Sequence, residues 1–330
     1  MRALGRFLGR LLLVLGVIGA ALWWFGPYEP VDLKATFEPR KFGEGVQVYF
    51  ESVESVHDDI TPGVEKRVIW QPGKAERRTP VSVLYIHGFS ATSEEIRPVP
   101  DRVADALGAN LVYTRLSGHG RGGEAMAMAA VNDWMQDVAE GLAAARAVGD
   151  RVVVIASSTG ATLAVAAALD ADLSRDVAAL VLISPNFGIN DPAAWALTLP
   201  AARYWLPLVV GSESGFEPSG DDHAKFWTTR YPTRALMPMA ALVRKVVAMD
   251  FSRATIPALF RISDSDTVVR PEITRAIAGR WGGAAVLQVV RMGEGDDPDA
   301  HVIAGDIRSP GQTEQTVRDI LDWLTRQETM

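Results

Sequence analysis

The chain has 330 residues, of which 48% are hydrophobic and 22% are charged, and its formal net charge is −7. This composition allows a large buried core and excludes a disordered chain. The acidic balance, with no cluster of Lys and Arg beyond the first ten residues, argues against a nucleic-acid partner. Cysteine is absent, which excludes disulfides and thiolate metal sites.

The first 30 residues differ from the rest of the chain. Three arginines within the first ten residues precede an uncharged apolar run over residues 11–25, and Gly26-Pro27 ends the run. Its apolar residues cover every side of a helical wheel, which argues against a buried helix of the folded domain. The segment is therefore predicted to be a targeting or anchoring helix.

Two interpretations of this helix remain open. A signal peptide would be cleaved after Gly19-Ala20-Ala21, and the protein would be secreted. A signal anchor would stay in the membrane, with Trp23, Trp24 and Tyr28 at the interface. In both cases the arginines are expected to stay in the cytoplasm, and residues after 30 lie on the outer side, which is the periplasm in a Gram-negative cell. Residues 31–45 then form a tether.

Residues 46–330 alternate short β-rich runs with helical stretches, which is typical of a mostly parallel sheet covered by helices on both faces. Residues 46–50 and 67–71 are predicted to be an antiparallel edge pair, and the apolar run 81–86 a central strand. Further strands are expected at 110–116, 151–156, 177–184, 257–263 and 284–290. Helices are expected at 100–107, 132–148, 159–169, 272–281 and 313–326. The fold class is α/β.

The sequence Ala-Ser-Ser-Thr-Gly at 156–160 lies between a predicted strand and a predicted helix. A nucleophilic serine on a sharp strand-to-helix turn needs small residues two positions before and after it, and Ala156 and Gly160 satisfy this around Ser158. The helix N-terminus would place free backbone N–H groups where an oxyanion forms. An ordinary N-cap serine is the structural alternative. Ser157 is the rival nucleophile, but it would put Thr159 where the second small residue belongs.

A serine hydroxyl needs a base to remove its proton, and the chain has five histidines. His57 and His223 lie in irregular segments, where we expect exposed polar side chains. His87 and His119 both precede Ser158. His301 follows the last predicted strand, where a base that comes after the nucleophile is expected, and it is the candidate general base.

The imidazole must be held in one tautomer by a carboxylate, and the segment 262–271 after the strand at 257–263 offers two. Asp266 is preferred because it lies on the turn just ahead of the Val268-Val269 pair. Asp264 remains the alternative.

Short motifs occur in a specific order along the chain: His87-Gly88-Phe89-Ser90, Leu116-Ser117-Gly118-His119-Gly120, the Ser158 turn, Asp266-Thr267-Val268-Val269 and His301-Val302-Ile303. From about residue 80 to the end, the chain resembles α/β-hydrolases of the monoacylglycerol-lipase and serine-aminopeptidase-like branch. The resemblance implies an oxyanion hole made by the backbone N–H groups of Phe89 and Thr159, with His87 and His119 shaping loops. No metal or organic cofactor is implied. Thr159 stands where this branch often has methionine, and Ser263 where a glycine commonly precedes the acid.

The segment from about 187 to 250 interrupts the strand-helix rhythm, where this fold usually inserts a cap. Its aromatic residues could cover an apolar pocket or simply form the core of the cap, and they include Trp195, Tyr204, Trp205, Phe216, Phe226, Trp227 and Tyr231. A lipid-like or medium-chain acyl ester is the expected substrate. An amidase, peptidase or acyltransferase would use the same three residues.

Other features of the sequence allow three further interpretations. Gly118, Gly120 and Gly123 match the spacing of a dinucleotide fingerprint, although a lone match of this kind is weak. The acidic run 293–299 could bind a hard cation, but such a run is more often a solvated loop. A membrane-anchored scaffold or binding protein would keep the fold without catalysis.

Overall fold

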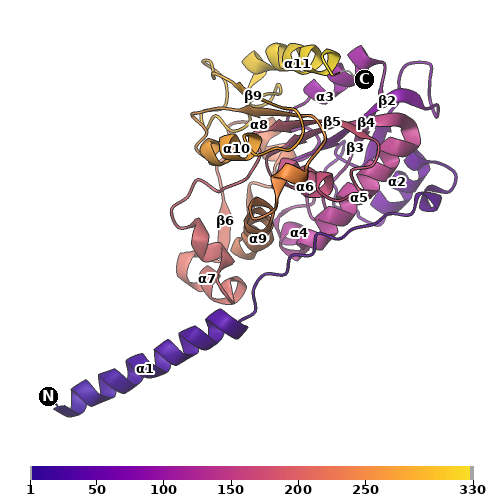
Figure 1. The fold of residues 1–330 in the computed structure, drawn as a ribbon. Helices are drawn as coiled ribbons and strands as arrows, with labels where there is room; N and C mark the ends of the chain where they lie inside the picture. The colour runs from indigo at the N-terminus through magenta and orange to yellow at the C-terminus, as the bar shows by residue number, and fades with distance from the viewer. Residues whose placement is uncertain (1, 328–330) are drawn as a thin grey trace.

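A seven-stranded sheet forms the centre of the computed structural model, which describes residues 2–327 (Figure 1). In spatial order the strands are β1 (Arg67–Ile69), β3 (Asn110–Tyr113), β2 (Thr79–Ile86), β4 (Gly149–Ser157), β5 (Val177–Ile183), β8 (Ala258–Ile262) and β9 (Ala285–Val289). β1 runs antiparallel to β3, and all the other neighbours are parallel. The predicted α/β fold is confirmed.

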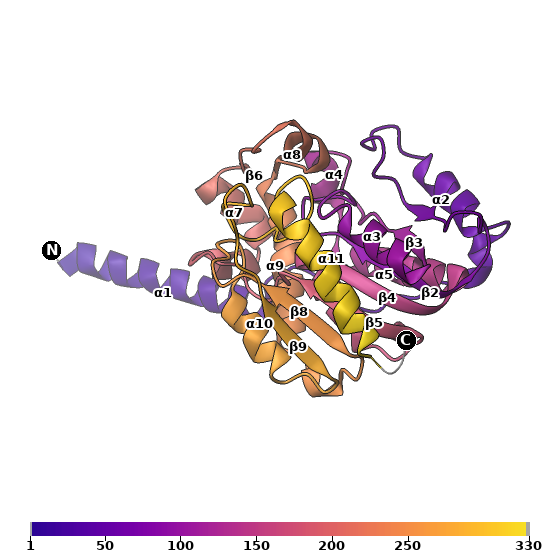
Figure 2. The same ribbon diagram turned by 90° about the horizontal axis from the view of Figure 1, so that it is seen from above.

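Helices cover both faces of this sheet (Figure 2). Alternate residues of each strand point to opposite sides, so that Leu84 packs in one core cluster and Tyr85 in the other. The first face is covered by α5 (Val131–Val148), α6 (Ser158–Ala168), α9 (Leu236–Val247) and α10 (Pro271–Ala278), and the second by α3 (Val99–Leu107) and α11 (Pro310–Thr325). The central strands are almost wholly apolar because neither face meets water.

The predicted strand at 46–50 is wrong, because these residues begin the helix α2 (Val46–Glu54). Val46, Phe50 and Glu54, which follow each other at intervals of four, are the buried residues of α2, whereas Val48 is exposed. The apolar period is therefore helical, and the alternation over five residues was too short to distinguish the two periods. β1 still forms an antiparallel edge, with β3 as its partner.

Between β5 and α9 the chain forms a small lobe of short elements. These are η2 (Ala194–Thr198), α7 (Ala202–Val210), β6 (Glu213–Gly215), α8 (Asp221–Phe226), β7 (Arg230–Pro232) and η3 (Thr233–Ala235). β6 and β7 pair in an antiparallel ribbon. The helix α9 that follows packs on α6, and its Leu242 and Val246 belong to the main core.

Helix α1 (Arg2–Phe25) extends away from the rest of the protein (Figure 1). Within it, residues Leu4–Phe25 have a mean hydropathy of 1.9, and none of this segment is buried. By length and composition the helix could cross a bilayer, although a signal sequence has the same properties. Further short elements are η1 (Pro39–Phe42), α4 (Gly123–Met128) and η4 (Phe251–Arg253).

Candidate active site

Ser158 lies at the junction of β4 and α6. Its backbone φ is 50°, a value that residues other than glycine rarely adopt. The turn is tight because α6 begins at the residue directly after the last residue of β4. A Cβ on Gly160 would lie 2.4 Å from the backbone oxygens of Ile86 and His87, and Ala156 is fully buried. Small residues at 156 and 160 therefore permit the turn that exposes the Ser158 hydroxyl to the cavity described below.

The three side chains predicted from the sequence lie in one hydrogen-bonded chain. Ser158 Oγ is 3.0 Å from His301 Nε2, and His301 Nδ1 is 2.8 Å from Asp266 Oδ2. The other carboxylate oxygen of Asp266 accepts hydrogen bonds from the Val268 and Val269 amides, each at 2.8 Å. The Asp266 carboxylate is thus fixed by its own turn and aimed at the ring.

The pKa of His301 is raised above the ordinary histidine value. Burial by itself disfavours the imidazolium, but the charge and hydrogen bond of Asp266 stabilise it, with further help from the carboxyl groups of Glu95 and Asp297. This environment suits a base that must hold a proton for part of a reaction cycle.

The rival residues have other partners. Asp264 lies at the surface in an ion pair with Arg275, and the Ser157 side chain bonds to the buried Glu95. His87 accepts a hydrogen bond from the Leu116 amide through Nε2, and burial lowers its pKa. His119 is also buried, and its pKa falls to about 4.

His223 corrects one expectation, because its side chain is buried and not exposed. It stacks on Phe216, makes an edge contact with Trp227 and accepts a hydrogen bond from the Ser219 amide. Burial, with Arg308 nearby, lowers its pKa to about 4, so the ring is neutral at physiological pH. His223 lies in α8 and Trp227 directly follows that helix, and because no helix was predicted in this segment, this packing could not be foreseen.

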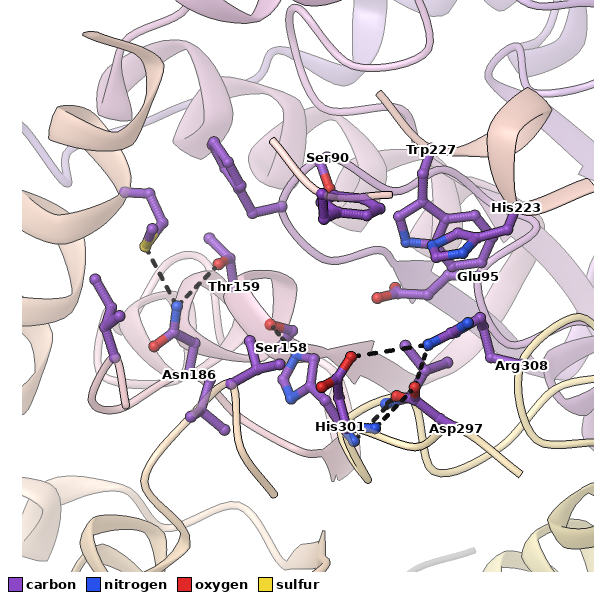
Figure 3. A pocket seen from close by; sticks show the side chains of 18 of the residues that line it. Ser90, Glu95, Ser158, Thr159, Asn186, His223, Trp227, Asp297, His301 and Arg308 are labelled. Carbon is purple, nitrogen blue, oxygen red and sulfur yellow. Dashed lines mark hydrogen bonds and ion pairs between the residues drawn. The ribbon is translucent and has the colours of Figure 1, made fainter. Parts of the chain in front are cut away.

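A cavity of about 380 Å³ opens above Ser158 and His301. Figure 3 shows Thr159 and Asn186 on one side of Ser158, and Glu95, His223, Trp227, Asp297 and Arg308 on the other. Met239, whose sulfur accepts a hydrogen bond from Asn186, lies on the first side, and the apolar residues Ile189, Leu236, Val268 and Val269 also line the cavity. Apolar and polar side chains therefore both line the cavity into which the Ser158 hydroxyl opens.

Phe89 and Thr159 line this cavity together with Ser158. The backbone before Phe89 is held by Glu95, whose Oε2 accepts hydrogen bonds from the Gly88 amide and from the Tyr85 hydroxyl, both at 2.8 Å. A Cβ on Gly88 would lie 2.7 Å from Glu95 and 3.0 Å from the Ser158 Cβ. Burial raises the pKa of the Glu95 carboxyl, even though these donors oppose the rise. Glu95 was not predicted as a site residue from the sequence.

The acidic run at 293–299 serves the loop that carries His301. Asp297 is buried, accepts hydrogen bonds from the His301 and Val302 amides and pairs with Arg308. Asp296 accepts hydrogen bonds from Gly293 and Gln312. Within residues 2–327, no group of three or more His, Asp or Glu side chains is placed to hold a metal ion. The cation interpretation has no support here.

The glycines of the dinucleotide spacing pack against the protein itself. A Cβ on Gly118 would meet the backbone of Ala125 and Met126, and one on Gly120 would meet Val64. The Gly120 carbonyl also accepts a hydrogen bond from Thr61. Their close approach serves internal packing and does not favour a pyrophosphate site.

Residues 78–290 match the family described as serine aminopeptidase, S33. The chain belongs to this family. A thermostable monoacylglycerol lipase from Bacillus sp. (strain H-257) is 31% identical to this S33 chain over 192 residues, which are 58% of the chain and 73% of the relative. The resemblance to α/β-hydrolases of this branch is thereby confirmed.

Solved structures show the same fold. A structure of the metagenome-derived lipolytic enzymes LipS and LipT superposes with a TM-score of 0.63 at 20% identity and covers 81% of this chain and 99% of that one. A soluble variant of monoglyceride lipase from Saccharomyces cerevisiae gives a TM-score of 0.57 at 14% identity, and the match covers 81% of this chain and 92% of that one.

Proposed function

We propose that this S33-family chain is a carboxylic ester hydrolase that acts through an acyl-Ser158 intermediate. The observation that carries the proposal is the continuous chain from Ser158 Oγ through His301 to Asp266, with contacts of 3.0 and 2.8 Å. These distances are within the range needed for proton transfer from a nucleophile to its base. The monoacylglycerol lipase relative supports an ester over other acyl substrates.

The reaction has two halves. His301 Nε2 takes the proton of Ser158 as its oxygen attacks the ester carbonyl, and the resulting oxyanion accepts hydrogen bonds from the Phe89 and Thr159 amides. His301 then gives that proton to the departing alcohol, which leaves an acyl-serine. Water, deprotonated by His301, attacks the acyl group, and the carboxylic acid is released as His301 returns this proton to the Ser158 oxygen. Asp266 stays ionised and orients the ring throughout.

The cavity supports a lipid-like or medium-chain acyl group joined to a polar alcohol. In this proposal the acyl chain lies beside Asn186 and Met239, and a polar leaving group lies on the opposite side of Ser158, beside Glu95 and Arg308. Helix α1 is proposed to anchor the protein in a membrane, with the catalytic body on the outer side. Cleavage of α1 would instead release a secreted enzyme.

The serine mechanism is tested by Ser158→Ala in the full chain, assayed in detergent micelles with p-nitrophenyl esters of increasing acyl length. We expect kcat to fall by about 10³- to 10⁶-fold without loss of the fold, because no hydroxyl remains to be acylated. Ser157→Ala is the matched control and should keep most of the activity. The reverse result would show that Ser157 is the nucleophile.

Two alternative functions are distinguished by a second substrate class and by a labelling probe. A peptidase or amidase would cleave p-nitroanilides faster than the matching esters. A scaffold that keeps the fold without catalysis would leave Ser158 unlabelled by a fluorophosphonate probe, whereas we expect the wild-type chain to be labelled and Ser158→Ala not to be.

A further inference from the structure

Helix α7 exposes apolar side chains on the face that a soluble protein would make polar. Its inner face is ordinary, because Ala202 and Leu206 are buried against Met237 in a small core of their own. On the outer face, Tyr204 is 69% exposed and Leu208, one turn later, is 86% exposed. Val209 and Val210 extend this surface to the end of the helix. We call these four residues the α7 outer face.

The α7 outer face belongs to the part of the molecule that meets helix α1. Figures 1 and 2 both place α7 beside the C-terminal end of α1. The segment directly after α1 is fixed to the start of α7: the Ala201 amide donates to the Pro27 carbonyl at 2.8 Å, and Glu29 forms an ion pair with Arg203. The position of α1 therefore determines the position of α7.

The end of α1 is itself aromatic and exposed, at Trp23, Trp24 and Phe25. Aromatic residues at this place in a membrane-spanning helix lie at the level of the lipid headgroups. Tyr28, which follows, bonds to the Trp23 carbonyl and lies under Arg244 of the body. With α1 in a bilayer, the body and α7 are held at the membrane surface and cannot move away from it along a flexible tether.

A bilayer explains the composition of α7 better than a protein partner does. Arg203 is its one charged residue, and that charge is already paired with Glu29. A helix that is apolar on both faces needs an apolar environment on both. The core of the lobe supplies one of them, and the bilayer that holds α1 reaches the other without any additional component.

We propose that the α7 outer face is a second membrane-docking surface, which inserts into the headgroup and acyl boundary of the bilayer that α1 spans. This inference rests on the membrane anchor proposed above and not on the ester chemistry. A two-residue turn joins α7 to β6, and Phe216, directly after β6, lines the cavity above Ser158. Docking would therefore place one wall of the cavity next to the lipid from which an acyl ester is drawn.

The experiment uses the absence of cysteine from the chain, so that a single introduced thiol is the one site of labelling. Leu208→Cys in the full-length protein is labelled with an environment-sensitive fluorophore and reconstituted into vesicles of phosphatidylethanolamine and phosphatidylglycerol. Val56→Cys is the matched control, because Val56 is similarly exposed but lies just after α2. Tyr204→Cys repeats the test one turn earlier on the same face.

We expect iodide to quench the label at 208 about fivefold less than the label at 56, because an interfacial helix places its apolar face ~5–10 Å into the headgroup boundary. Nitroxide groups on lipid acyl chains should quench the 208 label and not the 56 label. Equal quenching by iodide at both sites, in protein that floats with the vesicles, would overturn the proposal. Protection from iodide without quenching by lipid would also overturn it, since another protein surface would then cover α7.

Failure of the protein to float with the vesicles would remove the anchor and this proposal together. The fluorescence measurement does not depend on turnover, and it can be repeated in the Ser158→Ala background. Failure of the ester hydrolase proposal is therefore distinguishable from failure of the docking proposal.

Discussion

His301 is held by two carboxylates that act on different parts of the residue. Asp266 contacts the ring, whereas Asp297 accepts hydrogen bonds from the His301 and Val302 amides and so fixes the loop. The first contact sets the tautomer and charge of the imidazole, and the second sets its distance from Ser158. Substitution of Asp266 should therefore change the pH profile as well as the rate.

Asp266→Asn removes the charge that raises the pKa of His301. A base works in its neutral form, so kcat/KM of the wild type should fall on the acid side with a midpoint above the ordinary histidine pKa of about 6.5. In Asp266→Asn this midpoint should move to lower pH. We expect kcat to fall by about 10²- to 10⁴-fold, because no carboxylate then holds the His301 imidazole in the tautomer that can accept the serine proton. The measurement is kcat/KM for a short-chain ester between about pH 5 and pH 9.

Asp264→Asn is the control for this prediction. Its carboxylate pairs with Arg275 at the surface, so neither the rate nor the pH profile should change. A shift in Asp264→Asn and none in Asp266→Asn would reassign the orienting acid.

Glu95 is expected to position the backbone of the oxyanion hole. Glu95→Ala leaves the Gly88 amide and the Tyr85 hydroxyl without their acceptor, so kcat should fall by about 10- to 100-fold with KM little changed, as a small misplacement near the reacting atoms can cost this much. Glu95→Gln keeps an oxygen for both donors and should restore most of the rate. Steady-state kinetics of both variants test this, and equal losses in the two would contradict it.

Ser158, Asp266 and His301 could be predicted from the sequence because each follows a strand. The order nucleophile, acid, base also leaves few candidates, since only histidines and carboxylates after Ser158 qualify. It had no means of finding Glu95 or Asp297. Their roles depend on burial and on backbone donors that come together when separate loops pack, and neither has a fixed spacing from the nucleophile. The roles of the three predicted residues remain proposals that the kinetics above will test.

Among the elements, α2 and α5 are joined to the sheet by buried ion pairs. Lys66, just before β1, lies 2.9 Å from Asp137 and 2.6 Å from Glu140 on α5. Beside it, Glu54 of α2 pairs with Arg115, and all of these side chains are largely buried. Burial alone would lower the pKa of Lys66, but the two carboxylates raise it above the ordinary lysine value.

Lys66→Met should lower the free energy of unfolding by about 3–5 kcal/mol, because it leaves two buried carboxylates without their cation. Denaturant unfolding of the full chain in micelles measures the change. The exposed Lys74→Met serves as the control and should change stability by less than about 0.5 kcal/mol. A loss below about 1 kcal/mol in Lys66→Met would show that water reaches these carboxylates.

Most core elements were predicted from the sequence to within a few residues, because a strand buried on both faces is a continuous apolar run and is difficult to mistake. The error at α2 has the opposite cause. This helix lies at the periphery with one buried stripe, and five residues contain too little of that stripe to separate a period of 3.6 from a period of 2. The elements of the lobe between β5 and α9 are only three to nine residues long, which is too short for a period to be recognised against the irregular chain around them.

For the whole molecule, the proposed orientation across a membrane rests on the arginines at the start of α1 and on the body that follows it. Val56→Cys in the full chain should react with a membrane-impermeant maleimide in intact spheroplasts of a Gram-negative host, because the body is expected outside. Labelling that requires lysis would contradict this orientation. The intact mass of the purified protein shows whether α1 is retained or removed after residue 21.

The arrangement of the three candidate residues along the chain has a consequence for biosynthesis. Ser158 directly follows the fourth of the seven sheet strands in chain order, whereas Asp266 and His301 come after β8 and β9. A nascent polypeptide that has emerged only as far as α9 thus holds the hydroxyl but no partner able to activate it. Hydrolytic capacity would arise late, when the final quarter of the chain joins the sheet and α11 closes over its second face, and prematurely terminated products would remain inert towards the lipids around them.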